Sequence, residues 1–337
     1  MTFRLDRFDD FHLHGASAPE WNQRYLQMSP GAMRSALAEV TAGNVHVFRK
    51  WMSERVVQKG CLPAGKICFA VPAGSACGTP WIQGRELREN GVFILRGGEE
   101  FTLQRPRGME LLAVTFEAED FLRLLDARPW TTSARALLHR SVLLAPRDSV
   151  QHLRRDLLAL FAGRRSLGAC EAQAPEEQPA SRVMFEALGH LFNAAADARQ
   201  GFGSASASYI VAECHRVVAA RADAPPSIEE LCRRLRTSRR TLQNSFRQVA
   251  DTTAVHYLRC VRLNAVRRQL MATRPADLSI AQAATDQGFD HLSHFTERYQ
   301  ALFGELPSRT LRKDGIKALA CRDRGDARFS CATTGAR

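Results

Sequence analysis

Long apolar runs, paired cysteines and a secretory leader are all missing from the 337-residue sequence. No run reaches the ~18 apolar residues of a membrane-spanning helix, so no membrane contact is expected. The segment from Met1 to Arg7 lacks the apolar stretch of a secretory signal. The nine cysteines form no Cys-x-x-Cys pair and are odd in number, which favours a reducing compartment over a disulfide framework or a zinc site. We therefore expect a cytoplasmic protein.

Catalytic motifs are also missing. The patterns H-E-x-x-H, G-x-S-x-G and the phosphate-binding P-loop do not occur. Between Asn44 and Phe116 the single histidine is His46, which argues against a catalytic metal held by several histidines. We expect no enzyme activity, no metal and no certain cofactor. An enzyme with an accessory DNA-binding domain is a third possible class, but no residues support it.

Lysine is scarce, and arginine carries the positive charge. The segment from Pro225 to Arg312 contains 14 Arg, no Lys and 8 Asp or Glu, a net charge of +6 out of +12 for the whole chain. A basic balance of this kind is typical of proteins that bind a polyanion such as nucleic acid. The alternative is a helical bundle with a solvated basic surface, and Arg233, Arg267 and Arg268 are interpreted as solvated cations.

The pattern of apolar residues changes along the chain. Residues 44–116 contain short apolar runs separated by Gly and Pro, which is typical of strands. Residues 117–200 have helical spacing. The predicted fold class is α+β. The predicted divisions are an N-terminal domain at 1–200, a linker with a helix at 201–226, an all-α domain at 227–312 and a disordered tail at 313–337.

Two similar segments begin 52 residues apart, at Ser227 and Ser279. Each has the pattern of a short helix, a tight turn and a second helix with one apolar stripe, which predicts two helix-turn-helix units. The stripe residues lie four apart and are expected to face the core; they are Leu242 and Phe246, then Phe295 and Tyr299. Ser238 and Asp290 are the predicted N-caps of the second helices, and Gly288 suits a turn with positive φ.

The start of each second helix is predicted to face outward. The outward residues are Arg239, Arg240, Gln243 and Asn244 in the first unit, and His291, Leu292, Ser293 and His294 in the second. A recognition helix places its N-terminal residues against base edges, so these are candidate base-reading positions. A helix over Val255–Met271, about 25 Å long, would hold the two units about one DNA turn apart.

The C-terminal segment resembles the DNA-binding domain of the AraC/XylS family of bacterial regulators. The motifs are Ser238–Phe246, Arg262–Leu270 and Gly288–Ser308, which cover about a quarter of the chain. The resemblance implies that two recognition helices enter successive major-groove segments of double-stranded DNA. The complete candidate DNA-binding set is Arg239, Arg240, Gln243, Asn244, Arg247, His291, Leu292, Ser293, His294, Glu297 and Arg298.

Four positions depart from the family pattern. Asn244 and Glu297 stand where the family often has Arg. The carboxylate of Glu297 could accept a hydrogen bond from a cytosine amino group but would be repelled by phosphate. Asp251 and Ala254 stand where Gly and Pro are usual, and Asp tolerates a left-handed turn better than most residues do.

For the N-terminal half, the resemblance implies a cupin-like β-barrel that senses an effector, with a helical dimerisation region. It also implies a homodimer that activates transcription with RNA polymerase at the bacterial nucleoid. The chain is also similar to regulators of ethanolamine utilisation, which implies ethanolamine with adenosylcobalamin as effector. This similarity rests on Ser238–Asn244 and Arg262–Arg268 and, in the N-terminal half, on Trp21–Gly31 and Val47–Arg49. The alternative is a regulator controlled by a protein partner.

Overall fold

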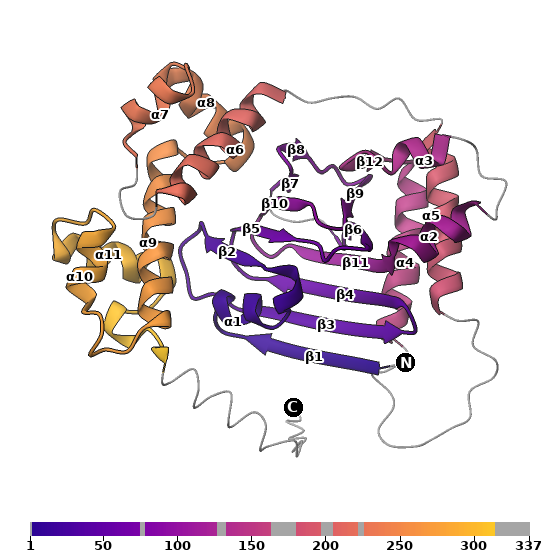
Figure 1. Ribbon diagram of the computed structural model, residues 1–337, viewed down its shortest axis with the longest axis horizontal. Helices are drawn as coiled ribbons and strands as arrows, with labels where there is room; N and C mark the ends of the chain where they lie inside the picture. Colours follow the sequence, from indigo (N-terminus) through magenta and orange to yellow (C-terminus); the bar gives the residue numbers. More distant parts are fainter. Residues whose placement is uncertain are drawn as a thin grey trace, which may run out of the picture.

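The computed structural model describes residues 2–74, 78–126, 133–162, 180–196, 205–221 and 226–313. These residues form an α+β protein with a strand-rich N-terminal domain and an all-helical C-terminal domain (Figure 1). The N-terminal domain is here called the sensor domain, after the role expected for it from the sequence. The predicted tail lies outside the described residues except for Lys313, and so do residues 201–204 and 222–225 of the predicted linker. No helix of the described ranges has the length and apolarity to cross a membrane.

Strands of the sensor domain form two antiparallel sheets. The larger sheet has the order β1 (Thr2–Phe8), β3 (Ser35–Ala42), β4 (Val45–Met52), β11 (Glu110–Glu117), β6 (Lys66–Pro72), β9 (Gly91–Arg96) and β12 (Val142–Leu144). The smaller sheet has the order β2 (Arg24–Gln27), β5 (Val56–Cys61), β10 (Glu100–Arg105), β7 (Trp81–Ile82) and β8 (Arg85–Glu86). No ladder joins the two sheets within the described residues, so the cupin-like arrangement does not close into one barrel.

Side-chain alternation along the strands separates two apolar cores. Phe48 and Leu111 of the larger sheet pack with Phe101 of the smaller sheet, in the space between the sheets. Phe69 and Val114 point to the other face of the larger sheet, where helices cover them. These helices are α2 (Ala118–Asp126), α3 (Ser133–Leu137), α4 (Arg147–Ala162) and α5 (Ala180–Ala196). The domain therefore has three layers, with the larger sheet in the middle.

Two boundaries differ from the sequence prediction. Strands begin at Thr2 and not near residue 44, since β1, β2 and β3 all precede that position. The strand β1 was missed because it is an edge strand whose charged, largely exposed residues hide the apolar alternation. The predicted helical region 117–200 also contains the short strand β12, which pairs with β9. The helix predicted within the linker corresponds to α6 (Ala205–Ala220).

A buried histidine in the sensor domain predicts acid sensitivity. His14, on α1 (Phe11–Ala16), is 1% exposed, and its Nδ1 lies 2.8 Å from Ser35 Oγ. Burial, together with the nearby charges of Lys50 and Arg105, lowers the pKa of His14 to about 2. The unfolded chain takes up this proton near pH 6.5, whereas the folded protein does not. The neutral imidazole of His14 therefore leaves the free energy of unfolding unaffected by pH above about 6.5. Below that pH the free energy of unfolding falls by about 1.4 kcal/mol per pH unit.

Denaturant titrations of His14→Gln between about pH 7 and pH 4.5 would measure this effect. We expect the variant to lose stability less steeply with falling pH than the wild type does. His190→Gln, at an exposed histidine of α5, is the matched control and should keep the wild-type slope. Equal slopes in His14→Gln and the wild type would contradict a neutral buried imidazole.

Candidate nucleic-acid interface

Five helices form the C-terminal domain, and the central one joins two similar pairs. The pairs are α7 (Ile228–Arg234) with α8 (Arg239–Ala250), and α10 (Ile280–Asp286) with α11 (Leu292–Phe303). Between them runs α9 (Ala254–Ala272), whose 19 residues make a rod of about 28 Å (Figure 1). The two predicted helix-turn-helix units and their helical connector are confirmed.

Local sequence chemistry sets the ends of the first recognition helix, α8. Ser238 is its N-cap, and the Ser238 Oγ accepts a hydrogen bond from the Thr241 N–H at 3.0 Å. Asp251 ends the helix in the left-handed region, with φ +46°, as expected for a residue that replaces the usual Gly. In the second unit, Gly288 adopts φ +73° between α10 and α11, as predicted.

The predicted N-cap of the second recognition helix is wrong. Helix α11 begins at Leu292, its N-cap residue is His291, and no side chain caps it. Asp290 lies one residue too early to serve as the cap. The free N–H groups at this end of α11 therefore remain available for an outside acceptor such as a phosphate oxygen.

One side of each recognition helix is buried, and the opposite side is exposed. Leu242, Phe246, Phe295 and Tyr299 are at most 1% exposed, as their spacing predicted. Ten of the eleven candidate DNA-binding residues are exposed; they are Arg239, Arg240, Asn244, Arg247, His291, Leu292, Ser293, His294, Glu297 and Arg298.

Leu292 is 45% exposed at the first position of α11, which is unusual for a large apolar side chain. In the major groove, a side chain of this kind can contact the methyl group of thymine. The Glu297 carboxylate lies 3.7 Å from His294 Nδ1 on the same helix, and the two side chains form an ion pair only when the imidazole is protonated.

Gln243 is the exception among the candidates. Its side chain is half-buried, and its Oε1 accepts a hydrogen bond from the Ala254 N–H at 3.3 Å, at the start of α9. The structure thus gives Gln243 a role in joining α8 to α9. The sequence pattern missed this role, because Ala254 follows eleven residues later across a turn.

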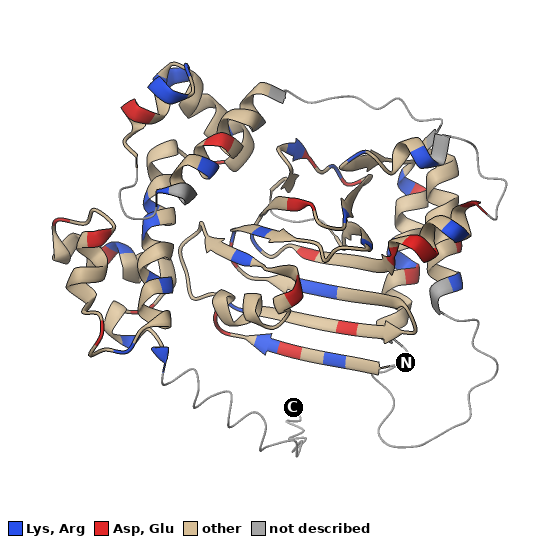
Figure 2. Cartoon of the chain, in the orientation of Figure 1, with Lys and Arg blue, Asp and Glu red and all other residues tan. Residues whose placement is uncertain are grey.

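Basic residues occur on the recognition helices and along α9 (Figure 2). The net positive charge of this segment, noted above, is the electrostatic requirement for approach to a phosphate backbone. Among the described residues, no group of three or more His, Cys, Asp or Glu could hold a metal ion.

The sensor domain holds the C-terminal ends of both recognition helices. The Arg55 guanidinium donates to the carbonyl oxygens of Ala250 and Asp251, at 3.1 and 2.9 Å, at the end of α8. The Gln27 side chain and the Gly31 N–H donate to the carbonyl oxygen of Leu302, at 2.6 and 3.1 Å, near the end of α11. Carbonyl groups at the C-terminal end of each recognition helix, which lack partners within the helix, therefore accept hydrogen bonds from the other domain.

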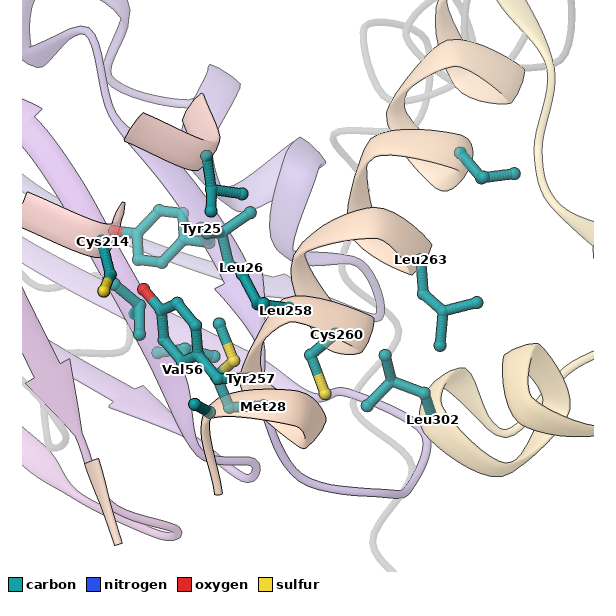
Figure 3. Packing of buried hydrophobic residues seen from close by; sticks show 14 of the residues in the cluster. Tyr25, Leu26, Met28, Val56, Cys214, Tyr257, Leu258, Cys260, Leu263 and Leu302 are labelled. Carbon is teal, nitrogen blue, oxygen red and sulfur yellow. The ribbon is translucent and has the colours of Figure 1, made fainter. Parts of the chain in front are cut away.

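Helix α9 packs along the edge strand β2. The Asn264 side-chain amide pairs with both backbone groups of Gln27, N–H to Oδ1 and Nδ2 to carbonyl, each at 2.9 Å. One asparagine thus occupies part of the free edge of the smaller sheet. Around this pair, Leu26 and Met28 of the sensor domain share an apolar cluster with Leu258 of α9 (Figure 3).

Arg267 contradicts its interpretation as a solvated cation. It is 7% exposed, and its guanidinium binds Asp10 and Glu305, both at 2.6 Å. Burial alone would raise the pKa of Asp10, but the charge of Arg267 holds it below its usual value. The sequence pattern missed this pair because Asp10 lies in the other domain, 257 residues away.

Replacing Ser238 by alanine is expected to lower the free energy of unfolding by about 1 kcal/mol, because the first turn of α8 loses its cap. Ser293→Ala is the matched control, since Ser293 is exposed near the start of α11 and caps nothing. Chemical denaturation of both variants measures the difference. Equal stabilities would mean that the Ser238 hydroxyl contributes nothing to the start of α8.

Comparisons with known proteins concern mainly the C-terminal domain. Residues 231–313 match the model of a helix-turn-helix domain family. Over 87 residues the chain is 41% identical to the XylDLEGF operon transcriptional activator of Pseudomonas putida, which covers 26% of this chain and 27% of that protein. Over 93 residues it is 31% identical to the probable thc operon regulatory protein of Rhodococcus erythropolis, which covers 28% of each chain.

Among solved structures, the AraC-like transcriptional activator CuxR has a TM-score of 0.43 and 14% identity, with 78% of this chain and 94% of that chain covered. The chain spans about a quarter of the length of the curated relatives it matches. Residues 231–313 therefore form a helix-turn-helix domain, in agreement with the two helix pairs described above. The sequence of this domain is similar to the activators of the XylDLEGF operon.

Proposed function

We propose that this protein is an effector-responsive transcriptional activator that inserts α8 and α11 into successive major-groove segments of DNA. The observation that carries the proposal is the arrangement of the two helices. Both present exposed N-terminal residues, among them Arg240 and Leu292, and both are fixed to the single rod α9. This is the geometry that a double helix-turn-helix reader needs.

The contacts of the sensor domain support control by an effector. Arg55 and Gln27 reach the C-terminal ends of the two recognition helices. A shift of β2 or β5 on effector binding would therefore move or release both helices together. We propose a homodimer acting with RNA polymerase on the bacterial nucleoid, without enzyme activity of its own.

DNase footprinting with the full-length protein tests the proposal. We expect a selected site with two protected segments about 10 base pairs apart, centre to centre, on one face of the duplex. Scrambling either segment should weaken binding strongly. Equal affinity for the scrambled and intact sites would overturn sequence-specific reading by two helices.

Ethanolamine with adenosylcobalamin is the effector pair that we propose to test first, on the resemblance of Trp21–Gly31 and Val47–Arg49 to regulators of ethanolamine utilisation. Thermal unfolding of the purified protein with each compound, and with a panel of metabolites, tests whether any of them binds. A rise in Tm identifies a ligand. No rise with any small molecule would favour the alternative, control by a protein partner.

A further inference from the structure

A cavity of about 100 Å³ lies where the sensor domain, α6 and the DNA-binding domain meet. Cationic residues from all three parts line it, and no Asp or Glu is among the lining residues. The cations are Arg24 of β2, Lys59 of β5, Arg221 after α6, and Arg262 and Arg268 of α9.

The charges in this cavity are poorly compensated. Arg221 is paired with Glu230, but Arg24 and Arg268 make no hydrogen bond or ion pair with any described residue. Burial lowers the pKa of Arg268, and the charge of Arg24 lowers it further. Arg24 is exposed and Arg268 is half-buried. Like charges held close together repel each other, and an anion between them would remove that repulsion.

Gln287 supplies a second, independent observation. It is the C-cap residue of α10, lines the cavity and is 1% exposed. Its side-chain nitrogen is buried and has no hydrogen-bond partner among the described residues. A buried donor without an acceptor is costly, so this amide fits an acceptor atom that the protein itself does not supply.

Apart from His215, which pairs with the hydroxyl of Tyr257, the rest of the wall is apolar. Leu26, Val218, Val261 and Ala265 line the cavity beside the cations. The lining thus suits a molecule with a charged head and a short apolar body. The small volume excludes a large ligand.

We propose that this cavity binds a small organic anion, with a carboxylate or phosphate head and a short apolar body, and that the bound anion ties the sensor domain to the DNA-binding domain. Arg24 and Lys59 would hold it from one side, and Arg268 with Gln287 from the other. A cation such as ethanolamine is repelled here, so the site is distinct from any site for that compound. Its influence on DNA binding rests on the function proposed above, but anion binding itself does not.

Thermal unfolding of the full-length protein without DNA tests the site, with butyrate, monobutyl phosphate and butylammonium as probes at equal ionic strength. We expect a saturable rise in Tm with at least one of the anions and none with butylammonium. The anion that raises Tm more at the same concentration shows whether the site prefers a carboxylate or a phosphate head group. Because DNA is absent, failure of the proposed DNA reading would not affect the result.

Two variants separate the cavity from nonspecific binding. Arg24→Gln with Arg268→Gln removes two charge-assisted contacts and should weaken the anion by about tenfold or more. Gln287→Glu places a carboxylate where the anion would lie, so it should raise Tm without ligand and abolish the response. Arg123→Gln with Arg182→Gln, at exposed arginines of α2 and α5, is the matched control and should respond like the wild type.

Three results would overturn the proposal. They are no saturable response to either anion, an equal response to butylammonium, and an undiminished response in Gln287→Glu. If the wild type ignores both anions while the Arg24 and Arg268 variant loses DNA affinity, the cluster is instead a contact surface for DNA phosphates.

Discussion

Arg267→Leu is expected to lower the free energy of unfolding by about 3–5 kcal/mol, the range for breaking a buried ion pair by removing one partner. The substitution leaves the carboxylate of Asp10 buried in the sensor domain without its cation. Glu305 at the end of the DNA-binding domain loses the same partner. Chemical denaturation of the full-length protein measures the loss.

The control and a double variant separate charge from packing. Arg233→Leu, at an exposed arginine of α7, should change stability by less than about 0.5 kcal/mol. Adding Asp10→Asn to Arg267→Leu should restore part of the loss, because the unpaired charge is gone. If the double variant is as unstable as the sum of the two single variants, the two side chains do not act as a pair.

Arg240→Ala is expected to weaken binding to the selected DNA site by about 1–3 kcal/mol, or roughly 5- to 150-fold. Arg240 is exposed on the first turn of α8, the part of a recognition helix that meets base edges. Binding to random DNA should fall much less, because there the protein holds mainly phosphates. Fluorescence titration with both DNAs at one salt concentration gives the comparison.

Arg123→Ala, at an exposed arginine of α2 in the sensor domain, is the control and should leave both affinities unchanged. The slope of affinity against salt adds a further test. An equal loss on the selected and random DNA, with a slope smaller by about one, would show that Arg240 contacts only phosphate.

The sequence predicted the C-terminal domain well because its signals are local. Residues four apart, such as Leu242 and Phe246, form the buried stripe of α8. Ser238 caps the same helix by accepting a hydrogen bond from the N–H three residues later. Asp290 failed as a cap because α11 begins one residue later than the sequence pattern predicted, so that His291 occupies the N-cap position. Of the candidate DNA-binding residues, Gln243 was placed least well, since its contact crosses a turn.

The junction between the domains could not be predicted, because its contacts join residues far apart in the chain. Asn264 and Gln27 are 237 residues apart, and their pairing depends on a free strand edge that no local pattern reveals. The same holds for the cations of the junction cavity, where Arg24 and Arg268 meet only after both domains are folded. The edge strand β1 was missed for a different reason, since a largely exposed strand lacks apolar alternation.

The junction between the domains limits which hybrids of related regulators can work. A hybrid joined in the linker before Ser227 would keep the DNA-reading helices but replace Asp10, Gln27 and Arg55 with whatever a foreign sensor carries there. Asn264 and Arg267 would then face unmatched partners. A working hybrid of this protein must therefore transplant those three sensor residues together with its DNA-binding domain.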